Sequence, residues 1–357
     1  MKIAVYTIAL NEKHFVERWY ESAKEADYLL IADTGSSDGT IDLGRDLGVN
    51  VVSISVKPWR FDDARNASLA LLPHDIDYCI ALDMDEVLIP GWRQAIEKTP
   101  EGTTRPRYKY TWSWNVDGTP GLQYGGDKIH ARRGYRWKHP VHEVIVTNQS
   151  TEVQNWIDLE IHHFPDHNKS RSQYMPLLAQ AVREDPADDR NTFYYARELY
   201  FHNRFPEAIS EFERHLSLPR ATWKPERAAS MRYIAKMHTN LETRREWLFK
   251  AHDEAPDRRE ALVDLAQLYY EQGQWFDCSY VAERAISITE KPLEYLCEEF
   301  AWGSAPWDFA AIANYHLGNF DKAVQYGTKA LELSPTDPRL TANLSFYSKE
   351  QSLGNNI

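Results

Sequence analysis

Several features that would assign this chain to a specialised class of protein are scarce or missing. It has only three cysteines, Cys79, Cys278 and Cys297, among 357 residues. Their spacing fits no zinc motif, and an odd number of thiols cannot pair completely into disulfides. This cysteine usage is typical of a reducing compartment, so we expect a cytoplasmic protein.

Long apolar runs and an excess of positive charge are missing as well. No run approaches the roughly 20 residues of a membrane span, so we expect no transmembrane helix. The short run Ile3 to Leu10 has no small-residue cleavage site, and we interpret it as a strand rather than a signal peptide. The formal net charge is −12, which argues against a protein that coats nucleic acid.

The first 90 residues alternate between strand and helix patterns. Buried strands are predicted at 3–9, 28–32, 51–56 and 78–82, with helices between them. This spacing is typical of a parallel sheet with right-handed crossovers. Residues 101–165 are rich in aromatic and β-forming residues, and we expect antiparallel strands that extend the edge of that sheet.

Polar clusters follow the predicted strands at their carboxyl ends, where parallel sheets bind their ligands. The densest cluster is Asp83-Met84-Asp85-Glu86. Carboxylates this close repel one another unless a cation or a proton neutralises them, and hard oxygen ligands suit Mg²⁺ or Mn²⁺. The alternative is an ordinary acidic turn between a strand and a helix. Two further clusters, at Asn11-Glu12 and at 33–40, fall at the same edge and favour a ligand site.

From residue 166 onward the sequence predicts helices and a repeat. Gly318-Asn319-Phe320, followed by Ala323, Ala330 and Pro335, is its clearest copy. Weaker copies are Gly273-Gln274-Trp275 with Cys278 and Ala285, Asn203-Arg204-Phe205 with Ala208, and Ala251 with Pro256. The spacing matches tetratricopeptide helix pairs of about 34 residues, which stack as a solenoid. We interpret Lys291 to Pro306 as an insertion, and we predict two domains, 1–165 and 166–357.

The order of motifs in the first domain resembles inverting family 2 glycosyltransferases of the GT-A fold, in the variety with a tetratricopeptide tail. The matching segments are 33–40 (Asp-Thr-Gly-Ser-Ser-Asp-Gly-Thr), Ala64-Arg65-Asn66, 83–86, 127–143 and 163–166. The resemblance implies an α/β GT-A catalytic domain, Rossmann-like with a mostly parallel sheet, followed by an all-α tetratricopeptide-type solenoid. It also implies metal-dependent transfer of a sugar from a nucleotide sugar, expected to be a UDP-sugar, to an acceptor hydroxyl or other nucleophile.

The resemblance implies roles for individual residues. Asp85 is expected to bind Mn²⁺ or Mg²⁺, with His163 as a second ligand or as a structural histidine. Contact with the nucleotide is expected from Ala9, Asn11, Glu12, Asp33, Arg65, Asp83 and Met84. Asp33 would accept a hydrogen bond from uracil, or else cap a turn. Asn11 and Glu12 could instead cap a helix. Arg65 would bind a phosphate, or else pair with Asp62 or Asp63.

Inversion requires a general base that takes the proton of the acceptor. Glu143 is our first candidate, with Asp117 and Asp127 as the alternatives, although Glu143 could instead form a structural ion pair with Arg132 or Arg136. A set of aromatic residues offers either acceptor platforms or core packing: Trp112, Trp114, Tyr124 and Trp137.

The sequence leaves the acceptor open as a glycan, a protein, a small molecule or a modified base of DNA. The DNA alternative would use the basic stretch 101–140 and make activity strongly dependent on salt. A third hypothesis is a catalytically inactive transferase fold whose solenoid recruits a partner. The solenoid would otherwise present the acceptor or mediate homo-oligomerisation.

Overall fold

The computed structural model describes residues 1–115, 117–166 and 172–354 of two compact units, Met1–Asp185 and Pro186–Ile357. A five-stranded sheet forms the centre of the first unit, with the strands in the order β3-β2-β1-β4-β8. Its strands are β1 (Ile3–Ala9), β2 (Tyr28–Asp33), β3 (Asn50–Ser53), β4 (Tyr78–Ala81) and β8 (Ile129–Ala131). The first four are parallel and only β8 is antiparallel, which confirms the predicted mostly parallel α/β sheet.

The strand order places a topological switch between β1 and β4. The chain runs from β1 outward to β2 and β3, then returns to the other side of β1 as β4. The connecting helices are α1 (Lys13–Ala23), α2 (Thr40–Asp46) and α3 (Phe61–Ala70). Ligands of open α/β sheets bind at such a switch, beyond the carboxyl ends of the strands. The predicted polar clusters after β1 and β4 therefore lie at the edge that this topology favours.

Both faces of this sheet are covered. Along β1, Val5 belongs to a core cluster that contains Trp19 of α1, whereas Tyr6 belongs to a second cluster with Trp137. Successive side chains of a strand point to opposite faces, so the uninterrupted apolar sequence of β1 is what a strand buried on both faces requires.

Residues 101–165 differ from the expectation of antiparallel strands along one sheet edge. Only β8 joins the central sheet, and a separate four-stranded sheet has the order β5-β11-β6-β7. Its strands are β5 (Glu86–Leu88), β6 (Arg105–Thr111), β7 (Gln123–Gly126) and β11 (Gln154–His163). Strands β6 and β11 pair in parallel, because the long intervening segment returns the chain to the start of β6. That segment includes the hairpin of β9 (Tyr135–Lys138) and β10 (Val144–Thr147), while α4 (Trp92–Glu97) and α5 (Tyr174–Glu184) complete the unit.

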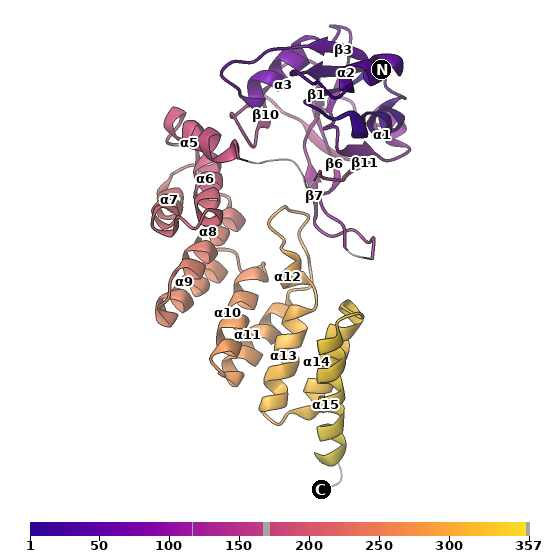
Figure 1. The fold of residues 1–357 in the computed structure, drawn as a ribbon. Helices are drawn as coiled ribbons and strands as arrows, with labels where there is room; N and C mark the ends of the chain where they lie inside the picture. Colours follow the sequence, from indigo (N-terminus) through magenta and orange to yellow (C-terminus); the bar gives the residue numbers. More distant parts are fainter. Residues whose placement is uncertain (116, 167–171, 355–357) are drawn as a thin grey trace. The chain divides into compact units, whose positions relative to one another are not determined.

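The second unit consists of consecutive helices (Figure 1). They are α6 (Asp189–Phe201), α7 (Phe205–Ser217), α8 (Lys224–Met237), α9 (Leu241–Glu254), α10 (Glu260–Glu271), α11 (Trp275–Ser287), α12 (Glu299–Trp302), α13 (Ala305–His316), α14 (Phe320–Leu333) and α15 (Pro338–Gly354). Asn203, Gly273 and Gly318 each occupy the turn between paired helices with positive φ angles of 56°, 65° and 75°. The left-handed backbone at these turns explains why glycine recurs in the repeat.

The remaining repeat positions are packed as the sequence indicates. The predicted small residues are fully buried: Ala208, Ala251, Cys278, Ala285, Ala323 and Ala330. The helical repeat architecture is therefore confirmed. The predicted insertion is present between α11 and α13, where residues 288–298 are not helical and α12 has a single turn.

Two further expectations concern the chain as a whole. Within the described ranges, no helix is long and apolar enough to cross a membrane. All three cysteines are free thiols and are buried. The domain boundary predicted between residues 165 and 166 stays a prediction, since residues 167–171 lie outside the described part of the chain.

Candidate functional site

Asp83 follows β4 and lies between two cations from distant parts of the first unit. Its Oδ1 accepts from Arg65 Nη2 of α3 at 2.7 Å, and its Oδ2 accepts from Lys128 Nζ at 2.6 Å. Burial raises the pKa of Asp83, but Arg65 and Lys128 outweigh burial and hold it far below the usual range of a carboxyl. Asp83 is therefore ionised at any physiological pH.

Glu86, the last acid of the cluster, supports the backbone of the turn that follows β4. Its Oε2 accepts from the backbone N–H of Asp83 at 2.8 Å. Its Oε1 accepts from Tyr110 Oη at 2.6 Å and from Lys128 Nζ at 2.7 Å. Glu86 is 1% exposed, so it holds the turn after β4 from the inside. Lys128 thus joins two of the three acids that the sequence placed together.

Arg65 connects this cluster to Glu143. Its Nε donates to Glu143 Oε1, and its guanidinium lies 4.9 Å from the ring centre of Trp137. Burial lowers the pKa of Arg65, but Asp83 and Glu143 raise it above its ordinary value. The third nitrogen, Nη1, is buried and has no hydrogen-bond partner among the described residues. The alternative pairing of Arg65 with Asp62 or Asp63 is wrong, because both acids pair with Arg60.

Asp85 and His163 face each other beside this cluster. His163 Nε2, at the end of β11, lies 3.5 Å from Asp85 Oδ2. The backbone also ties the two segments, since Phe164 N donates to the carbonyl of Asp85 at 2.8 Å. Burial lowers the pKa of His163, but its contacts with Asp85 and the Trp112 carbonyl outweigh burial and raise it. The structure therefore brings together the two residues expected to bind the metal, although 78 positions separate them in the sequence.

The donor set at Asp85 and His163 fits a divalent cation with few protein ligands. His163 Nδ1 lies 3.0 Å from the Trp112 carbonyl, which can only accept, so Nδ1 must hold a proton. A divalent cation between the two atoms would displace any proton from Nε2 and take its lone pair together with the Asp85 carboxylate. No group of three or more His, Cys, Asp or Glu residues in the described ranges could hold a metal alone. Two ligands still fit Mg²⁺ or Mn²⁺, because such ions often take substrate phosphates and water as further ligands.

Hydrogen bonds join the segment that follows β1 to the turn that follows β2. Asp33, at the end of β2, is fully buried and accepts from the backbone N–H groups of Gly35 and Ser36. Asn11 has a φ of 54°, and its side chain accepts from Ser37 N. Asn11 therefore does not cap α1, and the N-cap residue of that helix is Glu12, which makes no side-chain capping bond. Asp33 occupies its turn-capping role, whereas its contact with uracil stays a prediction.

The remaining candidate residues differ in their burial and in their partners. Ala9 ends β1, and Met84 is 2% exposed between Asp83 and Asp85. Asp127 pairs with Arg105 at 2.9 Å, and 43% of its side chain is exposed. Asp117 accepts from Thr119 N in an exposed turn. Of the three candidates for the general base, Glu143 is thus the one that the structure connects to Asp83, because both carboxylates accept hydrogen bonds from Arg65.

The aromatic candidates divide between the site and the core. Trp112 is 39% exposed and stacks on His163 with ring centres 4.4 Å apart. Trp114 Nε1 donates to the His163 carbonyl. Trp137 is buried, as expected for a core residue. Sequence reasoning did not assign Lys128 or Tyr110 to the site, and only the three-dimensional pairing with Glu86 reveals them. Lys128 had stood out only as one of several cations in a basic stretch.

Comparisons with known proteins give partial similarities. No family model matches the sequence. The helical region is similar to YrrB, described as a TPR protein with an unusual peptide-binding site, at 13% identity over 49% of this chain and 84% of that one, with a TM-score of 0.39. It is also similar to MamA, at 16% identity over 48% and 96%, with a TM-score of 0.37.

A further similarity concerns glucosyl-3-phosphoglycerate synthase from Mycobacterium tuberculosis, solved with Mn²⁺ and uridine diphosphate. Sequence identity is 28%, coverage is 30% of this chain and 44% of the synthase, and the TM-score is 0.26. The match to the Cut9–Hcn1 structure covers 33% of that chain at 15% identity, with a TM-score of 0.40. This chain thus spans less than half of the synthase and about a third of the Cut9–Hcn1 match.

Proposed function

We propose that this protein is a metal-dependent inverting glycosyltransferase that moves a sugar from a nucleotide sugar, with UDP as the nucleotide, to an acceptor nucleophile. The observation that supports this most is the facing pair Asp85 and His163 at the switch point of the sheet. Asp85 and His163 would hold Mn²⁺ or Mg²⁺. The ion would stabilise the negative charge that develops on the departing diphosphate.

The donor would lie beyond the ends of β1, β2 and β4. Arg65 Nη1 is a buried donor without a partner among the described residues, which supports a role in binding a donor phosphate. A buried guanidinium with an unused N–H group is costly unless an acceptor arrives. Asp33 and the turn 33–40 would contact the base, and Asp83 would hold Arg65 in place and orient the nucleotide.

Glu143 would act as the general base. Its side chain is 11% exposed and one oxygen accepts from Arg65 Nε, which fixes its direction. A carboxylate held in a fixed direction can take the acceptor proton while the acceptor attacks the sugar. Trp112, exposed above His163, would offer its ring face to a sugar.

Calorimetric titration with UDP, with and without Mn²⁺, tests this proposal. We expect Mn²⁺ to tighten UDP binding by about tenfold or more. Asp85→Asn should remove that gain while leaving the melting temperature unchanged, because it relieves repulsion and empties no core position. Asp75→Asn is the matched control, since Asp75 is an exposed acid of the same unit that pairs with Lys2.

Two results would contradict the proposal. The first is UDP binding that Mn²⁺ does not change. The second is an Asp85→Asn variant that responds to Mn²⁺ as the wild type and the Asp75→Asn control do. A folded protein that binds no UDP under either condition would likewise contradict the proposal and would support the inactive-fold hypothesis.

A further inference from the structure

The insertion in the helical unit contacts α8 and the residue Arg258 through polar side chains. We define the strap as residues 288–298, the non-helical segment between α11 and α12. Tyr295 Oη donates to Glu226 of α8 at 2.7 Å, and the Tyr295 ring lies 5.3 Å from that of Trp223. The strap therefore reaches back across a helix 69 positions earlier in the chain.

Two acids of the strap reach two buried arginines. Arg232 of α8 donates to both oxygens of Glu298, at 2.6 and 3.0 Å. Arg258 Nη1, just before α10, donates to Glu294 at 2.5 Å. With the strap in place, both arginines are only 4% exposed. The spacing of Glu294 and Glu298 thus matches the separation of the arginines on this surface.

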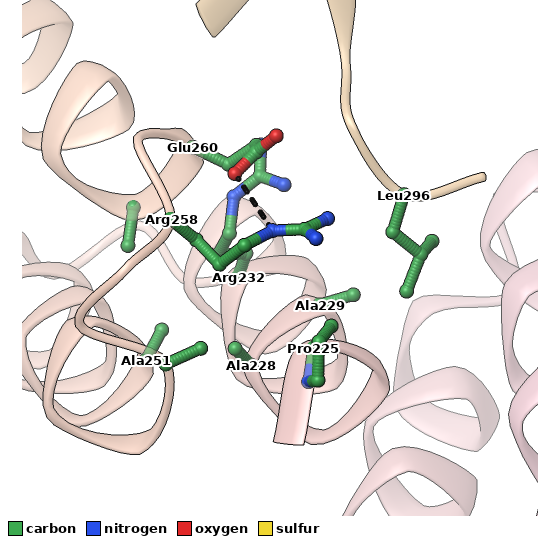
Figure 2. Close-up of a pocket in the computed structure, with 10 residues that line it drawn as sticks. Pro225, Ala228, Ala229, Arg232, Ala251, Arg258, Glu260 and Leu296 are labelled. Atoms are coloured by element: carbon green, nitrogen blue, oxygen red, sulfur yellow. Dashed lines mark ion pairs between the residues drawn. The ribbon is translucent and has the colours of Figure 1, made fainter. Parts of the chain in front are cut away.

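Both arginines line one small pocket, and their side chains lie next to each other near Glu260 (Figure 2). Leu296 reaches its rim from the strap, between the two acids in sequence. The other apolar lining residues are small and come from α8, α9 and the start of α10: Pro225, Ala228, Ala229, Ala251, Ala255 and Ala261. The surface therefore combines two cationic positions with an apolar pocket, which suits an acid–apolar–acid peptide.

Each arginine also has a partner within the helical frame. Arg232 Nε donates to Asp264 of α10 at 2.6 Å, and Arg258 Nε lies 3.5 Å from Glu260. If the strap left, neither arginine would become an uncompensated buried charge, which is the condition that makes breaking a buried ion pair most costly. Each arginine would thus keep one acid of the helices if the strap left, so an equivalent acidic segment could replace the strap.

We propose that the surface formed by Arg232, Arg258 and the pocket that they line is a binding site for an acidic peptide segment of a partner protein, which the strap occupies until the partner displaces it. Charge complementarity supports this occupant. Residues 288–299 contain one lysine and four acids: Glu290, Glu294, Glu298 and Glu299. Binding of the partner would therefore exchange one acidic segment for another. The affinity for the partner would depend on the free energy needed to release the strap.

The test weakens the strap in the full chain and offers its sequence in trans. Glu294→Gln combined with Glu298→Gln removes both charges that contact the arginines. The control combines Glu290→Gln with Glu299→Gln, which removes the same charge from exposed side chains. The probe is a fluorescent synthetic peptide of residues 290–299 with serine in place of the cysteine, and its binding is measured by anisotropy.

We expect the Glu294/Glu298 variant to bind the peptide about tenfold or more tightly than the wild type and the control variant. Adding Arg258→Met should abolish that gain. A variant that keeps the wild-type circular dichroism spectrum and binds no more tightly than the control would overturn the proposal.

Hydrogen exchange of the wild type provides a second measurement that needs no variant. A displaceable strap must open without unfolding the helices, so amides of 288–298 should exchange at a lower opening free energy than those of α8 and α10. Strap amides that exchange only by global unfolding would show that the strap is an integral part of the fold, and the proposal would be wrong. Neither measurement depends on transferase activity.

Discussion

Arg65 in the first unit and Arg232 in the second are both buried arginines held by two acids, yet they differ in one respect. Arg232 uses Nε on Asp264 and both terminal nitrogens on Glu298. Arg65 uses Nη2 on Asp83 and Nε on Glu143, and Nη1 is left buried without a partner in the described residues. All three nitrogens of Arg232 donate hydrogen bonds to acids of the helical unit. One nitrogen of Arg65 has no hydrogen-bond acceptor among the described residues.

The difference separates a guanidinium whose nitrogens are all used within the chain from one that keeps a buried donor for a ligand. A buried polar group without a partner costs free energy, so folds keep one mainly where something else requires it. The open nitrogen belongs to the cluster that also contains Asp83, and the sheet topology directs ligands to that edge. The nitrogens of Arg232 are instead all used while the strap is in place, so this guanidinium can accept another acid only after Glu298 has left.

The largest effect that we expect from this comparison is on the stability of the helical unit. Arg232→Met should lower the free energy of unfolding by about 3 kcal/mol, because it leaves Asp264 buried and poorly paired. The loss stays at the low end of the usual range since Lys236 Nζ lies 3.7 Å from Asp264. Urea unfolding measures it, and Arg204→Met, an exposed pair with Glu207, is the control. A loss below about 1 kcal/mol would show that the triad contributes no net stability.

A second prediction concerns catalysis at Glu143. Glu143→Gln keeps the shape and can still accept from Arg65, but it cannot take a proton. We expect turnover to fall by roughly a hundredfold while the dissociation constant of the UDP-sugar barely changes. Kinetics and calorimetry on the same preparation separate the two quantities. If donor affinity falls together with turnover, Glu143 serves to position Arg65, and the base must be sought among Asp117, Asp127 and other acids.

The sequence predicted those features that depend on local pattern. Gly273 and Gly318 mark turns, and Ala323 and Ala330 mark packed helix faces, because a repeat imposes the same local demand several times. The cluster 83–86 was placed correctly at a strand end, because the apolar run before it is a local pattern typical of a buried strand. The pairing of Arg65 with Asp83 and Glu143, and of Lys128 with Glu86, could not be predicted. Each depends on how far-separated segments meet, and many acids were available to each cation.

The second sheet shows the same limit. The strand pattern of β6 and β11 was visible in the sequence, but their parallel pairing depends on the path of the chain between them. Consequently the sequence could name His163 as a candidate ligand, but only the fold shows its position beside Asp85.

A third and smaller effect tests whether the turn residues act on stability alone. Gly318 has a φ of 75°, and a side-chain β-carbon there would meet no atom within 4 Å, so strain is the only cost. Gly318→Ala should therefore destabilise the helical unit by about 1 kcal/mol and leave UDP binding unchanged. Asn203→Gly, at the equivalent turn with a φ of 56°, should be neutral or slightly stabilising. Equal losses in both variants would mean that the turns respond to something other than backbone strain.

The smallest effect that we expect is a pH dependence of the strap contact. Burial raises the pKa of Glu298, but the Arg232 guanidinium outweighs burial and lowers it from 4.5 to about 2. A carboxyl whose pKa is depressed by folding contributes stability above its unfolded value and loses it as the pH falls through the folded value. The contribution of Glu298 should therefore be complete above about pH 4.5 and disappear toward about pH 2.

Urea unfolding of the wild type and Glu298→Gln across this interval isolates the contribution, because the other carboxyls titrate in both proteins. The stability difference between them should shrink as the pH falls. It should be modest at its largest, since the Glu298 side chain is 39% exposed and solvent screens the pair. Glu299→Gln, an exposed neighbour, should show a difference that does not change with pH. A constant difference for Glu298→Gln would mean that its ion pair with Arg232 adds nothing to folding, and that the strap is held by Tyr295 and Leu296 instead.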